Sequence, residues 1–260
     1  MVIDNYADLV KKPNNQYSKI KQFILLLPLV LFCSVLNGCQ QPMTPADTWQ
    51  ARMVAAHGGS DALGRISTLV FSGRIATRGD RGTVTLILSR PGKLRTTMKY
   101  SRSYEERLLL GNRGWRNFGS GFEEAAGHSL AAMAFQYNHL SLLMGIDDGT
   151  YTISYSERKS GDTVFPALEL LGADGPPMTV ILHPETGLIQ QIDGKIAMGD
   201  RQVIMAVGYS DYHEVSGVML PHRIVNYVDG NAIAESRYDT VAVNPELDQN
   251  TFTLELPAGE

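Results

Sequence analysis

Residues 68–90, TLVFSGRIATRGDRGTVTLILSR, indicate the class of fold to expect for this chain. Apolar and polar side chains alternate through TLVFSGRIATR, GDRG interrupts the pattern, and TVTLILSR alternates again. A period of two residues is typical of strands with one buried face, and a short glycine-containing turn between two such runs indicates a hairpin. We therefore expect this segment to form two neighbouring strands of an antiparallel sheet.

The same pattern continues on both sides of a central helical segment. Before that segment lie LRTTMKY at 94–100, YEERLLL at 104–110 and the shorter WRNF at 115–118. After it come seven further runs, at residues 150–157, 163–172, 177–183, 187–199, 202–215, 218–230 and 232–244. Leaving WRNF aside, the expected number of strands is about eleven. A sheet of that width curls as its twist accumulates, so we expect a mainly β fold with some helix, a curled antiparallel half-barrel with helices over its concave face.

Two segments have helical periodicity instead. Thr44, Pro45 and Asp47 are an N-terminal signal for a helix that carries Trp49. The segment GHSLAAMAFQYNHLSLLMG, residues 127–145, repeats apolar side chains at intervals of three and four. We interpret it as a core helix that covers the sheet. The alternative is a movable cover over a cavity, because methionine-rich surfaces adapt to variable apolar partners.

The N-terminal residues have the features of an export signal. Four lysines precede an apolar run from Phe23 to Val35, which is 13 residues long and shorter than the about 20 that a membrane-spanning helix needs. The run ends at LNGC, residues 36–39, which resembles the lipobox of bacterial lipoproteins, although Asn37 is polar where that motif has a small or aliphatic residue. A signal peptide without lipidation, or a short uncut anchor, is the alternative interpretation.

The lipobox resemblance implies cleavage before Cys39 and acylation of that cysteine. Residues 1–38 are then the signal peptide, 39–43 a short tether and 44–260 a single domain. Cys33, the only other cysteine, lies in the apolar run and would be removed with it, so Cys39 has no disulfide partner in the mature chain. The residue after the cysteine is Gln40 and not aspartate, and in this respect the chain resembles lipoproteins that are sent to an outer membrane. We expect a lipid-anchored, periplasm-facing protein of the cell envelope.

The charge balance excludes one class of partner. Residues 1–38 contain four of the 23 basic and two of the 27 acidic side chains, so the remainder carries a net charge of −6 with histidine neutral. A negative surface repels the phosphates of nucleic acids and anionic lipid alike. We expect no nucleic-acid partner, and membrane contact only through the lipid anchor.

Three longer segments resemble a known family. They are AHGGSDALGRISTLVFSGRI at 56–75, DYHEVSGVMLPHRIVNYVDG at 211–230 and VAVNPELDQNTFTLELP at 241–257. They are similar to envelope proteins of the outer-membrane lipoprotein-sorting type, which share the LolA/LolB fold. The resemblance implies an open half-barrel with an apolar cavity that accepts acyl chains. It does not extend to the carrier's latching arginine or the acceptor's protruding leucine loop; Phe122 is a candidate exposed apolar loop residue, more simply read as folded back onto the core.

These patterns favour a protein that binds a hydrophobic ligand without a cofactor. The ligand would be a lipid or the acyl chains of a lipoprotein, transferred during lipid or lipoprotein transport. The candidate ligand-binding residues have apolar bulk and lie on the expected helices and nearby strands: Trp49, Met98, Leu108, Met133, Tyr137 and Leu140. The alternative is an envelope sensor or scaffold that uses the same half-barrel to recognise lipoproteins or a protein partner.

An enzyme is the third possibility considered, and the sequence offers little for it. A two-residue turn at Ser216-Gly217 would pair His213 with Leu220 and Asp211 with His222, placing one carboxylate and two imidazoles on one face of a hairpin. Such a set could bind the metal of a hydrolase, but a solvated charge cluster explains it as well. The nucleophile, phosphate-binding and zinc-protease motifs do not occur in the sequence. We expect no catalytic residue and no metal.

Overall fold

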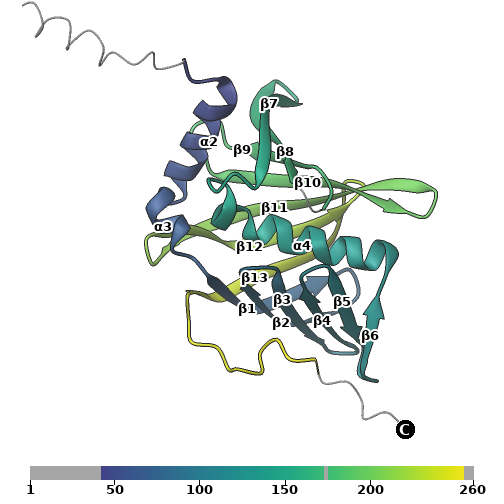
Figure 1. Cartoon of the computed structure of the whole chain (residues 1–260). Helices are drawn as coiled ribbons and strands as arrows, with labels where there is room; N and C mark the ends of the chain where they lie inside the picture. The colour runs from purple at the N-terminus through teal and green to yellow at the C-terminus, as the bar shows by residue number, and fades with distance from the viewer. Residues whose placement is uncertain (1–41, 173–174, 255–260) are drawn as a thin grey trace, which may run out of the picture. The chain divides into compact units, whose positions relative to one another are not determined.

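The computed structural model describes residues 42–172 and 175–254. Thr44–Glu260 forms a compact unit of its own, and the described part of it contains one sheet and three helices (Figure 1). The helices are α2 (Pro45–Ala56), α3 (Ser60–Gly64) and α4 (Gly127–Gly145). The strands are β1 (Thr68–Thr77), β2 (Arg81–Ser89), β3 (Lys93–Tyr100), β4 (Tyr104–Leu110), β5 (Arg113–Asn117), β6 (Phe122–Ala125), β7 (Tyr151–Ser160), β8 (Thr163–Gly172), β9 (Met178–Leu182), β10 (Ile189–Met198), β11 (Arg201–Val215), β12 (Val218–Val228) and β13 (Asn231–Val243).

The sheet is antiparallel throughout, in the order β6-β5-β4-β3-β2-β1-β13-β12-β11-β10-β9-β8-β7. Strands that are consecutive in sequence therefore pair with each other, apart from β6 and β7, and β1 pairs with β13 in the middle of the sheet. The two edge strands, β6 and β7, are the ones that α4 connects. The expected fold class is confirmed: the sheet curls without closing, and α4 lies across its concave face (Figure 1).

The described sheet has thirteen strands where the sequence predicted about eleven. The first three residues of the uncertain run WRNF belong to β5, and the additional strand is β6, which contains Phe122. The interpretation of Phe122 as a loop residue was therefore wrong, since it pairs with Asn117 in the β5–β6 hairpin. β6 is only four residues long and carries two adjacent glutamates, so it shows no clear alternation.

Helix α2 begins as its sequence predicts. Thr44 accepts a hydrogen bond from the Asp47 backbone N–H, and the Asp47 carboxylate accepts one from the Thr44 backbone N–H at 2.9 Å. This reciprocal capping satisfies two of the N–H groups that every helix leaves free at its start. The helix then packs against β7 and β8, with Met53 and Val54 buried in the core.

Helix α4 rests on the sheet through two glycines. A Cβ atom on Gly194 of β10 would lie 2.5 Å from Cε2 of Phe135, and one on Gly114 of β5 would lie 3.0 Å from Cε of Met133. Both distances are shorter than ordinary van der Waals contacts. At Gly194 a methyl group would overlap the Phe135 ring, whereas at Gly114 the end of the Met133 side chain would have to shift by a few tenths of an ångström. The helix therefore contacts the sheet at β5 and at β10, and these two strands lie far apart in the strand order.

Candidate functional site

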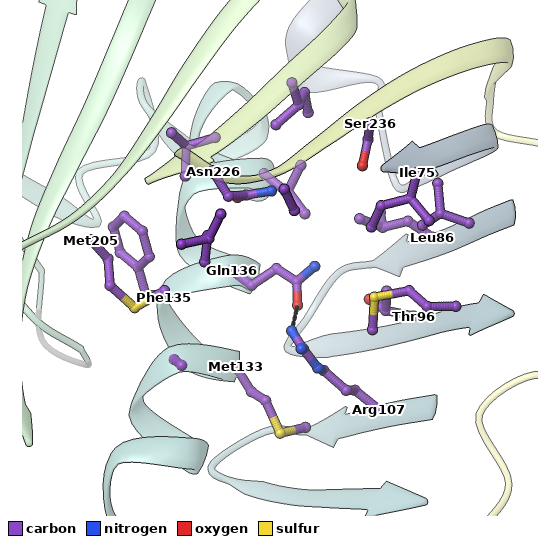
Figure 2. Close-up of a pocket in the computed structure, with 18 of the residues that line it drawn as sticks. Ile75, Leu86, Thr96, Arg107, Met133, Phe135, Gln136, Met205, Asn226 and Ser236 are labelled. Atoms are coloured by element: carbon purple, nitrogen blue, oxygen red, sulfur yellow. Dashed lines mark hydrogen bonds between the residues drawn. The ribbon is translucent and has the colours of Figure 1, made fainter. Parts of the chain in front are cut away.

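A cavity of about 370 Å³ lies between α4 and the concave face of the sheet. Strands β1 to β5 and β11 to β13 form its walls, and α4 covers it. Much of the lining is apolar, and Figure 2 shows Ile75, Leu86, Met133, Phe135 and Met205 around the space. The volume lies within the range of about 300–1,000 Å³ that small-molecule sites occupy.

Alternation along the strands makes the apolar wall. Val84 and Leu86 of β2 are buried and line the cavity, and Val84 is paired with Met98 of β3. Ile224 of β12 continues the wall on the other side of the β1–β13 pair. Because residues two apart on a strand face the same side, this wall is the direct product of the period-two pattern.

The wall becomes polar toward β4 and β5. Direct cross-strand pairs join Leu86 to Thr96, Thr96 to Arg107 and Arg107 to Arg116, so one row of the concave face runs from an apolar residue on β2 to two arginines. Thr96, Arg107 and Arg116 all line the cavity. We call these three residues the polar row.

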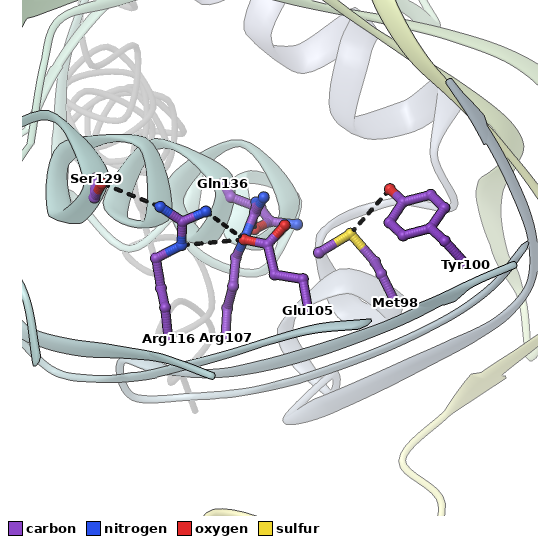
Figure 3. Close-up of polar contacts among 7 residues, drawn as sticks. All are labelled: Met98, Tyr100, Glu105, Arg107, Arg116, Ser129 and Gln136. Atoms are coloured by element: carbon purple, nitrogen blue, oxygen red, sulfur yellow. Dashed lines mark hydrogen bonds and ion pairs between the residues drawn. The ribbon is translucent and has the colours of Figure 1, made fainter. Parts of the chain in front are cut away.

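Glu105 holds the two arginines together (Figure 3). Its Oε1 accepts hydrogen bonds from Arg107 Nε at 2.7 Å and from Arg116 Nη2 at 2.7 Å. Burial alone would raise the pKa of Glu105, but the hydrogen bonds and charges of the two arginines hold it below its usual range. The carboxylate is therefore ionised at neutral pH.

The contacts from the polar row to α4 are longer. Arg116 Nη1 lies 3.3 Å from Ser129 Oγ, and Arg107 Nη1 lies 3.5 Å from Gln136 Oε1 (Figures 2 and 3). The usual N–H···O distance is about 2.7–3.2 Å, so these are weak bonds. The residues that follow the C-terminal end of α4 make shorter contacts. Ser60 Oγ donates to Asp147 at 2.6 Å, and Arg90 Nη2 pairs with Asp148 at 2.5 Å.

A buried polar pair lies on the other side of the cavity. His139 of α4 lines the space, and its Nδ1 lies 2.6 Å from the Tyr209 hydroxyl. Burial lowers the pKa of His139 to about 3 and raises that of Tyr209 well above its usual value. Both side chains are neutral at pH 7, so this side of the cavity carries no net charge.

Three of the six predicted ligand-binding residues line the cavity: Met98, Met133 and Leu140. The other three lie elsewhere. Tyr137 points away, and its hydroxyl accepts a hydrogen bond from the Gly92 backbone N–H in the β2–β3 turn at 2.7 Å. Trp49 is half-buried on α2 beneath the guanidinium of Arg52. Neither residue is in the cavity lining, so the prediction placed too much weight on apolar bulk.

Leu108 is on the opposite face of the sheet. It pairs with Arg95 and Trp115, whereas its neighbour Arg107 lines the cavity. Leu108 is completely buried all the same, and the C-terminal segment contacts this face, where Arg95 Nη1 donates to the Thr251 carbonyl at 2.8 Å. A buried convex face cannot be told from a concave one by hydrophobicity alone, which is why the parity of this strand was misjudged.

The hairpin cluster forms as its turn predicts. Val215 pairs with Val218 and His213 with Leu220. The pairing passes from Ser210 and Arg223 to Tyr212 and Pro221, and Asp211 between them has a left-handed backbone with φ 56°. The His213 Nε2 and Asp211 Oδ1 atoms lie 3.0 Å apart, and the rings of His213 and His222 are 4.5 Å apart. Asp211 and His213 are more than half exposed. Among residues 42–172 and 175–254, no group of three or more His, Cys, Asp or Glu side chains is arranged to hold a metal ion.

Sequence reasoning missed the polar row. A signal was present, because Arg107 lies two residues after Glu105 and Thr96 two residues before Met98, so each pair shares a face. Only the register of β3, β4 and β5 shows that these faces coincide. Cys39, the predicted lipid attachment site, lies outside the described residues.

Comparison with solved structures identifies the architecture. The described fold is similar to a LolA superfamily protein from Nitrosomonas europaea, with a TM-score of 0.51 and 13% identity over 80% of this chain and 97% of that one. It is similar also to a putative outer membrane lipoprotein-sorting protein domain from Vibrio parahaemolyticus (0.50, 8%, 80% and 96%) and to a DUF1329 family protein from Desulfovibrio piger (0.52, 12%, 81% and 98%).

The protein has a LolA-like fold. No family model and no curated protein matches the sequence. At 8–13% identity the likeness concerns the arrangement of sheet and helix, so it identifies the half-barrel and its covering helix but not a ligand. Within the described part of this LolA-like chain, no helix is both long enough and apolar enough to span a bilayer.

Proposed function

We propose that this LolA-like half-barrel binds the apolar part of a lipid, or an acyl chain of a lipoprotein, and acts by binding rather than by catalysis. The observation that carries the proposal is the cavity of about 370 Å³ under α4, with its apolar wall of strand residues. The neighbouring structures with the same fold, one of them a putative outer membrane lipoprotein-sorting protein domain, are in keeping with such a role.

Burial of the chain supplies the driving force. Each methylene group moved from water into an apolar site contributes about 0.8 kcal/mol. Release needs only a second site or a bilayer that offers the same environment, so transfer requires no covalent chemistry. A half-barrel covered by one helix suits this task, because the ligand can be buried without a channel through the sheet.

A substitution that fills the cavity tests the proposal. Ala132 of α4 lines the cavity, whereas Ala134 on the same helix does not, so Ala132→Phe and Ala134→Phe form a matched pair. Binding of an uncharged fluorescent probe, N-phenyl-1-naphthylamine, is measured on the Thr44–Glu260 unit together with extraction of co-purified lipid. A phenyl ring that excludes two methylene groups of ligand would weaken binding on the order of tenfold.

The Ala132→Phe variant should lose probe and lipid while Ala134→Phe retains both. Equal binding by the two variants, or a wild-type domain that takes up neither probe nor lipid, would exclude the cavity as the binding site. An empty domain that co-purifies with one protein in fixed ratio would instead support the sensor or scaffold function.

The proposal includes a membrane anchor at Cys39. Its support is the sequence LNGC at residues 36–39 behind a 13-residue apolar run. Two acyl signals on one cysteine would hold the domain at a membrane surface durably, and the glutamine that follows favours the outer membrane. Metabolic labelling with palmitate should mark the wild-type chain and not Cys39→Ser. Label retained by that variant would place the lipid elsewhere.

A further inference from the structure

We infer that the polar row, whose arginines are ion-paired with Glu105, is a subsite for one anionic group, so that the ligand is an amphiphile with a carboxylate or phosphate head and an apolar tail. The inference rests on the proposed function, because it assigns the tail to the same cavity. It adds the chemical class of the ligand and the direction in which it lies.

The charges at this end of the cavity do not balance. Two guanidinium groups, Arg107 and Arg116, share the one carboxylate of Glu105, which leaves one positive charge over. Their side chains are only 28% and 29% exposed, and that of Glu105 is 15% exposed. Glu123, opposite Arg116 on β6, is exposed, so solvent screens its charge. A partly buried surplus charge favours uptake of a counter-charge.

The hydrogen-bonding groups also have unused capacity. Thr96 is 2% exposed and lines the cavity, and its Oγ1 has no hydrogen-bond partner within the described part of the chain. A buried hydroxyl without a partner is destabilising, and Thr96 is paired with Arg107 in the row. A ligand oxygen above the row could accept from this hydroxyl and from a guanidinium at once.

The arginines can serve an anion without releasing Glu105. Arg107 uses Nε and Arg116 uses Nε and Nη2 for the carboxylate. Within residues 42–172 and 175–254, their Nη1 groups have only the weak hydrogen bonds with Gln136 and Ser129, at 3.5 and 3.3 Å. A guanidinium fork binds planar carboxylate or phosphate oxygens well, so the exchange of two long bonds for charge-assisted ones is favourable.

The position of the row sets the orientation of the ligand. Along the row the wall changes from Leu86 on β2, through Thr96 on β3, to the arginines on β4 and β5. An anionic head at β4–β5 therefore directs the tail toward β2, β1 and the apolar residues of β11 to β13, where Ile224 and Met205 lie. The opposite orientation would leave the tail against the charged residues.

Ligands that differ only in the head test this inference. Laurate, dodecyl phosphate and methyl laurate are titrated into the Thr44–Glu260 unit, with displacement of N-phenyl-1-naphthylamine as the readout. We expect the two anions to bind at least tenfold more tightly than the ester. The readout is the ratio of anion affinity to ester affinity. This ratio should fall to about one in Arg107→Gln/Arg116→Gln and should fall part of the way in Thr96→Val.

Control variants separate binding from folding. Arg223→Gln removes an ion-paired arginine of similar exposure, 35%, that is not in the cavity lining, so the anion preference should persist. Thr96→Val changes no charge, so a loss of anion preference in that variant cannot come from an unpaired Glu105. Arg107→Lys keeps the positive charge but loses the guanidinium fork. It should therefore retain part of the anion preference that the double variant loses.

The outcomes are distinct. Equal affinity of the wild type for laurate and methyl laurate overturns the inference and leaves the proposed function intact. Failure to bind any of the three ligands overturns the proposed function itself. Inorganic phosphate that binds as tightly as dodecyl phosphate would also overturn the amphiphile, because the subsite would then take a free anion.

Discussion

Gly194 of β10 offers the sharpest test of how α4 is held over the sheet. In Gly194→Ala, the new methyl group would lie 2.5 Å from Cε2 and 2.7 Å from Cδ2 of Phe135, so the ring and the helix behind it must move. Overpacking of this kind costs about 1–3 kcal/mol. Alanine also lowers the conformational entropy of the unfolded chain, which stabilises the folded protein by about 0.4–1 kcal/mol. We expect a net loss of about 1–2 kcal/mol in the free energy of unfolding.

The control is Gly208→Ala on the adjacent strand β11, whose Cβ would meet Tyr227 at an ordinary 3.4 Å. That variant should be neutral or slightly more stable. Urea unfolding of the Thr44–Glu260 unit measures both, and for a domain of this size a loss of 1 kcal/mol corresponds to about 2–4 °C in Tm. Probe binding should change in Gly194→Ala as well, because Phe135 lines the cavity. Equal stability and equal binding in the two variants would refute the contact between α4 and β10.

Two other predictions follow from the faces and charges of buried side chains. Leu108→Ala and Met133→Ala should each lower the free energy of unfolding by about 2–5 kcal/mol. Only Met133→Ala should weaken probe binding, because Leu108 is on the convex face. Weaker binding by both variants, beyond what unfolding explains, would contradict that placement. Burial lowers the pKa of His57 to about 4, so between about pH 6.5 and pH 4 the unfolded chain takes up a proton that the folded protein does not. His57 then removes about 1.4 kcal/mol of stability per pH unit as the pH falls through that interval. His57→Asn should flatten the pH profile there by that amount, and an unchanged slope would show that His57 stays accessible.

The local pattern of this sequence predicted its local structure well. The 127–145 segment is the helix expected from its spacing, and Thr44 caps α2 as its neighbours indicate. Asp211 and His213 share a face because they are two residues apart on β11, and the Ser216-Gly217 turn determines the register that brings His222 of β12 beside His213. These features depend on residues close together in sequence, where the pattern contains all the necessary information.

The candidate site was only partly predictable. Met98 and Met133 reach the cavity, but Leu108 is on the other face because the C-terminal segment covers that face and allows it to be apolar too. The polar row joins β3, β4 and β5, and its members become neighbours only through pairing that no single strand reveals. In the sequence, Arg107 and Arg116 cannot be distinguished from ordinary surface arginines. Their shared carboxylate and their place in the cavity lining are visible only in the folded protein.

The sheet order explains why a cavity is present at all. Thirteen strands at about 4.8 Å spacing would separate the edge strands by about 58 Å if the sheet were flat. The chain connects those edges, β6 and β7, by α4, whose 19 residues span only about 28 Å, followed by a turn in which Asp148 bonds back to Gly145. The sheet must therefore curl until its edges lie within reach of the helix. One helix about 10 Å across cannot fill the hollow side of so wide an arc. Its flanks contact β5 and β10 at Gly114 and Gly194, and the space left against β1–β5 and β11–β13 is the cavity.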